Sequence, residues 1–381
     1  MNTIYAISHS ILSPLGNSSQ QNFDAILQQQ PAIKQQQDSL VSDRHFYAAR
    51  LASSQTEMLQ SRYSKSSQAL SPFEQMCVCA IEEALNDLQI DVTSDDCILI
   101  LSSTKGNIEW LGKQPDEQVG LQYSAQIISA YFGMKHKPLI ISNACISGSM
   151  ALIMGKRLLQ SNRYKHAIVI GCDRFSGFVF SGFQSFHALA DRLCKPFDKD
   201  RNGINLGEAA ACIVLSSDKE LAAEKPLAIL SGGGLSNDAN HLSGPSRTGA
   251  ELANAIAQAM DEAIVKAEDI GLISAHGTAT IFNDEMEAKA LQLAKVNTKP
   301  MHSLKSYVGH TLGAAGLIES VIACMAMQAS YLPASLGFVE SGVPVDVNIT
   351  TTATAADYNH LLKTASGFGG CNAALVWTKY K

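Results

Sequence analysis

An α/β fold built from two similar halves is the architecture that this 381-residue sequence predicts. Apolar runs of strand length alternate with helix-length segments, a pattern that predicts parallel sheets covered by helices on both faces. The order strand, loop, buried helix occurs around Cys145 and again around His310. A charged stretch, residues 217–225, lies between the two. We therefore expect an N-terminal half, residues 1–217, and a C-terminal half, residues 226–381, whose loops meet at a shared site.

The N-terminal half has one clear helix start. Ser71 is placed to cap the helix, Pro72 lies in its first turn, and Glu74 completes a capping box, so a helix is expected to about Leu88. Residues 175–195 read as a Gly/Ser-rich loop with five phenylalanines, which form either core packing or the wall of an apolar pocket. The other expected elements are strands at 3–8, 97–101, 138–141, 167–171 and 210–216 and helices at 121–134 and 147–159.

The C-terminal half repeats this order of elements without repeating its residues. An amphipathic helix is expected at 249–265 and a helix that is buried all round at 314–330. The remaining expected elements are strands at 226–231, 272–275, 301–304 and 373–378 and a helix at 284–294.

Composition narrows the class of protein. The sequence is 46% hydrophobic and 17% charged, which favours a large core over disorder. The net charge of −6 disfavours a general nucleic-acid binder. No apolar run approaches ~18 residues, so no membrane span is expected. Nine cysteines and no signal peptide indicate a reduced, cytoplasmic protein, and Cys77 and Cys79 lack the partner pair of a zinc site, so no metal is expected.

Cys145 is placed at a sharp turn between a strand and a buried helix. A thiol there meets unpaired N–H groups and the positive end of the helix dipole, both of which favour the nucleophilic thiolate. Taken alone, the residue favours a buried structural cysteine, because free cysteine is among the residue types most often buried.

Three later segments favour the catalytic interpretation. His276 begins the run His-Gly-Thr-Ala-Thr at the C-terminal end of a strand, where α/β proteins place their sites. His310 lies in a second tight turn, and residues 367–372 form a Gly-rich turn that can present backbone N–H groups. A cysteine nucleophile, two histidines and such a loop are together suited to acyl transfer.

At these motifs the chain resembles β-ketoacyl-acyl carrier protein synthases, and within them the elongating condensing enzymes with a Cys-His-His site. The resemblance spans nearly the whole chain. It implies a thiolase-like fold, with two duplicated αβαβα halves in a five-layered arrangement. Its landmarks are Asn143-Ala144-Cys145, residues 195–203, Gly207-Glu208, residues 276–280, Lys305 with Gly309-His310, and Gly367-Phe368-Gly369-Gly370.

The resemblance implies a decarboxylative Claisen condensation. Cys145 would be acylated from an acyl carrier protein thioester. His276 and His310 would polarise the malonyl thioester carbonyl during loss of CO₂, and the carbanion would attack acyl-Cys145. The backbone N–H groups of Cys145 and Phe368 would form the oxyanion hole. The product would be a 3-oxoacyl-acyl carrier protein, in fatty-acid synthesis or in a specialised polyene or polyketide pathway.

Further roles follow from the same resemblance. Lys305 and Glu319 match a buried pair that sets the charge of the site. Thr278 and Thr280 match residues that bind the pantetheine arm, and Phe183, with Phe368, matches the phenylalanines that gate the acyl pocket. Two carboxylates match polar support of the site: Asp284 and Glu287.

The resemblance also predicts binding partners, and the sequence differs from the family pattern at a few positions. The resemblance implies an acyl carrier protein as partner, no cofactor beyond the phosphopantetheine that arrives on it, and a dimer, homomeric or heteromeric, paired through the strand Ala167–Gly171. Residues 207–211 read Gly-Glu-Ala-Ala-Ala where the family often has more glycine, and His187 stands where many members carry an arginine for the carrier protein.

Three alternatives remain open. A non-condensing, chain-length-factor-like subunit of a ketosynthase heterodimer shares the fold, but such subunits usually lack the nucleophile. An initiating enzyme of the Cys-His-Asn class is disfavoured by His310 and its spacing from Lys305. A cysteine hydrolase would need water at the acyl group.

Overall fold

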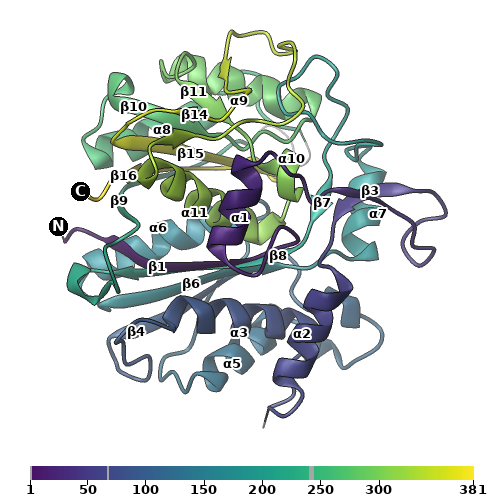
Figure 1. Ribbon diagram of the computed structural model, residues 1–381, viewed down its shortest axis with the longest axis vertical. Helices are drawn as coiled ribbons and strands as arrows, with labels where there is room; N and C mark the ends of the chain where they lie inside the picture. Colours follow the sequence, from purple (N-terminus) through teal and green to yellow (C-terminus); the bar gives the residue numbers. More distant parts are fainter. Residues whose placement is uncertain (1, 67, 240–243) are drawn as a thin grey trace.

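The strands of the two halves have the same order and the same directions in the computed structural model, which describes residues 2–66, 68–239 and 244–381 (Figure 1). In the N-terminal half the order is β5 (Leu139–Ile141), β4 (Cys97–Ser102), β6 (His166–Asp173), β8 (Ala209–Ser216) and β1 (Tyr5–Leu12). In the C-terminal half it is β11 (Pro300–His302), β10 (Ile270–Ser274), β15 (His360–Gly367), β16 (Cys371–Thr378) and β9 (Ala228–Asn237).

Both halves mix strand directions, whereas the sequence predicts parallel sheets. The pairs β5–β4 and β4–β6 are parallel, but β6–β8 and β8–β1 are antiparallel, and the C-terminal half repeats this pattern. The short connection between β15 and β16 explains part of it, because a three-residue turn can join only antiparallel strands. Pairing of β1 with β9 at Ala6 and Ala228 joins the halves, and β13 (Asn348–Ile349) extends the edge at β11.

The helices complete five layers (Figure 1). Helices α3 (Pro72–Leu85) and α5 (Leu121–Tyr131) cover the outer face of the N-terminal sheet. Helices α8 (Ala250–Ala263) and α9 (Ile281–Leu293) form the opposite outer layer. Between the sheets lie α6 (Ser147–Gln160) and α11 (Ala315–Gln328), which contact each other. This is the expected thiolase-like arrangement.

The remaining elements are shorter or lie at the rim. The helices are α1 (Ser19–Leu27), α2 (Ser53–Tyr63), α4 (Asp116–Val119), α7 (Gly177–Ser185) and α10 (Lys305–Val308). The strands are β2 (Lys34–Gln36), β3 (Phe46–Ala49), β7 (Leu206–Gly207), β12 (Tyr331–Leu332) and β14 (Thr354–Ala355).

Two local expectations about these elements have clear outcomes. The capping box of α3 is confirmed, since Ser71 Oγ accepts from the Glu74 N–H at 3.1 Å and Glu74 Oε2 accepts from the Ser71 N–H at 2.8 Å. The long loop expected at 175–195 is wrong in its first part, because residues 177–185 form α7, capped by Ser176. Glycine at 177 and 182 obscures the helix in the sequence, and only Val179 and Phe180 of α7 are buried.

The expected dimer strand is also wrong. The residues Ala167–Gly171 belong to β6, which is hydrogen-bonded to β4 on one side and to β8 on the other. Both edges of β6 are therefore occupied. Among the described strands of this half, β5 at the end of the sheet has a single neighbour, β4.

Two further expectations concern the state of the cysteines and the presence of membrane-spanning helices. All nine cysteines are free, buried thiols. None of the helices in the described part of the chain is both long and apolar enough to cross a bilayer.

Candidate active site

Cys145 sits in a strained turn between β5 and α6. Ala144 has φ +44°, a left-handed conformation that non-glycine residues seldom adopt, and it turns the chain sharply ahead of the cysteine. The Ser147 hydroxyl braces the turn by accepting from the Asn143 N–H and donating to the Ala144 carbonyl, both at 2.7 Å. Cys145 is buried at this turn.

The Gly-rich turn at 367–370 packs directly against Cys145. A Cβ atom at Gly367 would come within 3.0 Å of the Cys145 backbone nitrogen, so only glycine allows this approach. The backbone N–H of Phe368 lies close enough to the Cys145 sulfur to lower the pKa of the thiol. The two N–H groups expected to form an oxyanion hole therefore lie beside the nucleophile.

His276 and His310 are fixed by their backbones. Glu287 Oε1 and Oε2 accept from the N–H groups of His276 and Gly277, each at 2.8 Å, which holds the end of β10. The His310 N–H donates to Asn205 O at 2.7 Å. Before it, Gly309 has φ +68°, and a Cβ there would lie 2.6 Å from Leu206 O, so this turn also requires glycine.

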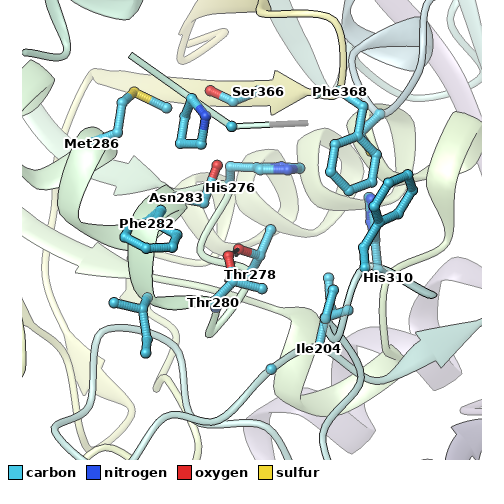
Figure 2. Close-up of a pocket in the computed structure, with 18 of the residues that line it drawn as sticks. Ile204, His276, Thr278, Thr280, Phe282, Asn283, Met286, His310, Ser366 and Phe368 are labelled. Atoms are coloured by element: carbon cyan, nitrogen blue, oxygen red, sulfur yellow. Dashed lines mark hydrogen bonds between the residues drawn. The ribbon is translucent and has the colours of Figure 1, made fainter. Parts of the chain in front are cut away.

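The three groups converge although 131 residues separate Cys145 from His276. The Cys145 sulfur, one ring nitrogen of His276 and one ring nitrogen of His310 all lie within 4.8 Å of one another. The imidazole rings are nearly perpendicular, with centroids 5.4 Å apart. Figure 2 shows both imidazoles lining the same pocket, which Phe368 also lines. Both nitrogens of His310 are buried, and neither is hydrogen-bonded to a described residue.

Lys305 determines which nitrogen of His276 carries the proton. Its Nζ lies 3.2 Å from His276 Nδ1 and 2.7 Å from Glu319 Oε1. An ammonium can only donate, so Nδ1 accepts and Nε2 keeps its hydrogen. Burial, together with the charges of Lys305 and Lys363, lowers the pKa of His276 and of His310 well below the ordinary 6.5. Both imidazoles are therefore neutral at neutral pH.

The thiol differs from the thiolate that the sequence predicts. Burial raises the pKa of Cys145 to about 12, and the Lys305 charge and the Phe368 N–H offset only part of that increase. Loss of hydration outweighs the helix N-terminus because α6 begins two residues later, at Ser147. A protonated thiol next to a neutral imidazole can pass its proton to that imidazole as the sulfur attacks.

The pocket leading to Cys145 has a volume of about 580 Å³ and is lined by all the expected substrate-contacting residues. Thr278 Oγ1 and Thr280 Oγ1 are hydrogen-bonded to each other at 2.8 Å along one wall (Figure 2). Asp284 accepts from the Thr278 N–H at 3.0 Å and from the Phe197 N–H at 2.7 Å, and so holds this wall in place. His187, with φ +53°, also lines the pocket.

The five phenylalanines of residues 175–186 divide into a core pair, the two pocket residues Phe183 and Phe186, and the exposed Phe178. Phe175 and Phe180 are buried and pack on Phe46, as the core interpretation predicts. Phe183 lies 5.6 Å from the Phe368 ring and 6.4 Å from the His310 ring, and it lines the pocket. Phe183 is therefore in a position to gate, but gating itself stays a prediction.

One buried charge beside the site has no counterpart in the sequence analysis. Lys363 lies on β15 with Nζ 2.7 Å from Glu319 Oε2. The sequence does not predict β15, because Lys363, Thr364 and Ser366 interrupt its apolar run. That lysine between Leu362 and Thr364 was the available signal, since lysine is almost never fully buried without a partner.

The sulfur and two nitrogens of the site would also make a possible set of zinc ligands. The ammonium of Lys305 next to His276 Nδ1 opposes a second cation there. The expectation of a site without metal stays a prediction.

Comparison with known proteins identifies the family. The model described as "Beta-ketoacyl synthase, N-terminal domain" matches residues 1–220, and that described as "Beta-ketoacyl synthase, C-terminal domain" matches residues 227–339. Because the first match alone spans more than half of the chain, this protein belongs to the β-ketoacyl synthase family of acyl-transferring condensing enzymes.

Individual relatives agree with this assignment. The 3-oxoacyl-[acyl-carrier-protein] synthase 2 of Vibrio cholerae is 27% identical to this chain in an alignment 412 residues long, and the alignment covers 97% of each of the two chains. The solved ishigamide ketosynthase/chain length factor matches with a TM-score of 0.89 and 24% identity over 100% of both chains. A ketosynthase in complex with its chain length factor from Xenorhabdus doucetiae matches with a TM-score of 0.85 and 24% identity, over 100% of this chain and 98% of that one. The two structural matches support the fold.

Proposed function

We propose that this protein is an elongating 3-oxoacyl-acyl carrier protein synthase. It transfers an acyl group from a carrier protein to Cys145 and condenses it with malonyl-carrier protein, with loss of CO₂. The observation that carries the proposal is the convergence of the Cys145 sulfur and one nitrogen each of His276 and His310 within 4.8 Å, beside the Gly-rich turn at 367–370.

Acyl transfer comes first in this proposal. The N–H groups of Cys145 and Phe368 bind the thioester oxygen while the sulfur attacks its carbonyl carbon, and the thiol proton passes to a neutral imidazole. The carrier protein leaves as its free thiol after taking up a proton, and the acyl group remains on Cys145.

Condensation follows at the two histidines. The malonyl thioester oxygen accepts hydrogen bonds from His276 and His310, and its terminal carboxylate leaves as CO₂. The electron pair of that C–C bond forms an enolate, whose negative oxygen is stabilised by the imidazole N–H groups. The enolate carbon attacks the acyl carbonyl, and the Cys145 sulfur leaves and is reprotonated. The protein supplies no cofactor, because phosphopantetheine arrives on the carrier protein.

The alternative of a non-condensing partner subunit has one supporting observation, namely the likeness to ketosynthases solved with a chain length factor. The presence of Cys145, His276 and His310 in one buried cluster favours the catalytic function instead. A heterodimer in which this chain is the condensing subunit satisfies both observations. We place the reaction in the cytoplasm, in fatty-acid synthesis or a specialised polyene or polyketide pathway.

Mass spectrometry tests this proposal directly. Purified protein incubated with acyl-carrier protein should gain the acyl mass on the peptide that contains Cys145. Adding malonyl-carrier protein should then release CO₂ and give a product two carbons longer. Acylation followed by hydrolysis, without a new carbon–carbon bond, would identify a hydrolase. Absence of acylation on Cys145 would contradict both activities.

We also propose a dimer that pairs through β5. This short strand ends the N-terminal sheet, and Leu139 and Ile140 are only half-buried on it. An apolar edge strand exposes unpaired N–H and C=O groups, and a two-fold partner strand would satisfy them. Light scattering at micromolar concentration should give twice the mass of the 381-residue chain, or the sum of this chain and its partner subunit. If this chain has a monomeric mass both when purified alone and when purified with its partner subunit, pairing through β5 is contradicted.

A further inference from the structure

A polar row crosses the C-terminal sheet behind His276. Ser274, the last residue of β10, is in register with His302 of β11 and with Lys363 of β15. In-register residues on adjacent parallel strands point to the same face of a sheet. Lys363 reaches Glu319 on α11, so the row faces the middle layer of helices.

Lys363 is fully buried and surrounded by oxygen atoms. Its Nζ is 2.7 Å from Glu319 Oε2, donates to Ser274 O at 3.3 Å and also donates to Thr364 O. The contact with Oε2 is an ion pair, and the other two are hydrogen bonds that an ammonium group donates, so these oxygens match the protonated form of Lys363 while burial lowers its pKa. The lysine thus carries a positive charge behind the active site.

Glu319 lies between two lysines. Lys305 Nζ is 2.7 Å from Oε1 and Lys363 Nζ is 2.7 Å from Oε2, so each oxygen of the carboxylate has its own cation. Burial acts to raise the pKa of Glu319, but the two lysines outweigh it and hold the pKa below the ordinary range. The carboxylate is therefore charged and fixed at both ends.

This arrangement determines where Lys305 points. Because Lys363 occupies Oε2, Lys305 contacts only Oε1 and keeps its Nζ 3.2 Å from His276 Nδ1. Without Lys363, one lysine would face both carboxylate oxygens and would be drawn toward the middle of the carboxylate. Its hydrogen bond to Nδ1 would weaken, and with it the preference for the Nε2–H tautomer.

We infer that Lys363 is a positioning residue for the decarboxylation step, acting through Glu319 and Lys305 so that His276 presents Nε2–H to the malonyl thioester. The inference rests on the proposed condensing function. It assigns Lys363 no contact with substrate, and therefore predicts little effect on acylation of Cys145.

The first test is the variant Lys363→Gln, which removes the charge but can still donate to a carbonyl. We expect a loss of about 10-fold in CO₂ release from malonyl-carrier protein, less than the ~10²-fold of losing an acid–base group itself. Acylation of Cys145 should stay within about 2-fold of wild type. The matched control is Lys165→Gln, a surface lysine 65% exposed that pairs with Asp96, which should change neither rate.

The pH dependence of CO₂ release distinguishes a positioning role of Lys363 from a general loss of stability in the variant. Lys363 holds down the pKa of both imidazoles, so removing its charge raises those pKa values. Imidazolium then forms at higher pH, and the acid limb of CO₂ release should move to higher pH in Lys363→Gln. The other titratable or charged groups around His276 keep their identity in the variant: Cys145, Glu287, His302, Lys305, His310 and Glu319. Of these, His302 and Glu319 also have pKa values that the Lys363 charge lowers.

A readout that needs no turnover distinguishes failure of the inference from failure of the proposed function. ¹⁵N-histidine NMR of the resting protein reports the tautomer of His276, assigned with His276→Gln. Wild type should show Nε2–H, and Lys363→Gln should show a mixture of tautomers. A wild-type protein that releases no CO₂ would count against the proposed function and leave this readout intact. An unchanged tautomer in Lys363→Gln, with unchanged CO₂ release, would overturn the inference.

Two further variants apply if Lys363→Gln does not fold. Lys363→Arg keeps the charge and should keep both the tautomer and the acid limb. Glu319→Gln breaks the same chain of contacts and should lose CO₂ release while acylation persists. Wild-type CO₂ release in Glu319→Gln would overturn the inference equally.

Discussion

The two halves of the molecule have one topology but place different chemistry at the same position. The equivalent strands β4 and β10 both end on a serine, Ser102 and Ser274. The register partner of Ser102 on β6 is Gly171, whereas the partner of Ser274 on β15 is Lys363. Equivalent sites in a duplicated frame thus hold the smallest residue in one half and a buried charge in the other.

Gly171 leaves space for a loop of the C-terminal half. A Cβ at Gly171 would lie 3.0 Å from Gly313 O, and Ser102 Oγ donates to that same carbonyl at 2.6 Å. Gly313 follows His310 in the C-terminal half, so the N-terminal half makes room for the histidine loop. Under the proposed function, the N-terminal half supplies the nucleophile and space, and the C-terminal half supplies the charges for decarboxylation.

The strongest test of this division is Cys145→Ala. Condensation should be abolished, because the proposed attachment point of the acyl group is lost, while the fold stays intact since only a sulfur atom is removed. The measurements are product formation with malonyl-carrier protein and circular dichroism. Substantial elongation by a folded variant would end the assignment of Cys145 as nucleophile.

His310→Ala and His276→Ala test the other half. Each should lower the rate of condensation by at least ~10²-fold, the scale of a lost acid–base or oxyanion group. Acylation of Cys145 should fall less, which single-turnover mass spectrometry can measure beside CO₂ release. A near wild-type rate of elongation in His310→Ala would show that the two-histidine assignment is wrong.

The pH dependence of alkylation tests the protonation state of the nucleophile. With the pKa of Cys145 raised to about 12, the thiolate fraction grows about tenfold per pH unit throughout the range from 7 to 9. Iodoacetamide modification should follow that slope, after subtraction of the background in Cys145→Ala. A rate that levels off near pH 8 would instead favour the thiolate that the helix N-terminus predicts.

The smallest expected effect on rate comes from the gate. Phe183→Ala should change the preference for acyl chain length more than it changes stability, because this ring faces the pocket. The matched control is Phe180→Ala, three residues earlier on α7 but buried against Phe46 and Phe175. That variant should cost about 3–5 kcal/mol of stability with an unchanged chain-length profile. Melting temperatures of both variants and their rates with a panel of acyl-carrier proteins of different chain length distinguish a gating ring from a core ring. A large loss of stability in Phe183→Ala, with an unchanged preference for acyl chain length, would exclude the gate.

The sequence alone determined the features that local residues encode. The capping box of α3 follows from Ser71, Pro72 and Glu74, which lie within four consecutive positions. The order of the other core strands and helices follows from apolar runs that each element carries within itself, with β15 and α7 as exceptions. Cys145, His276 and His310 stand out for the same reason, since each lies in a short run of Gly, Ser or Thr beside a strand or helix. These signals span a few residues and need no knowledge of distant contacts.

The tertiary structure decided what depends on distant neighbours. Burial protonates Cys145 and neutralises both imidazoles, and the amount of burial is set by segments more than a hundred residues away. The interior place of β6, which excludes it as a dimer edge, depends on β8 closing its second side. Lys363 reads as an interruption of an apolar run until the fold brings Glu319 to it. A charge in the sequence becomes an active-site charge only when the fold removes water from it and supplies its partner.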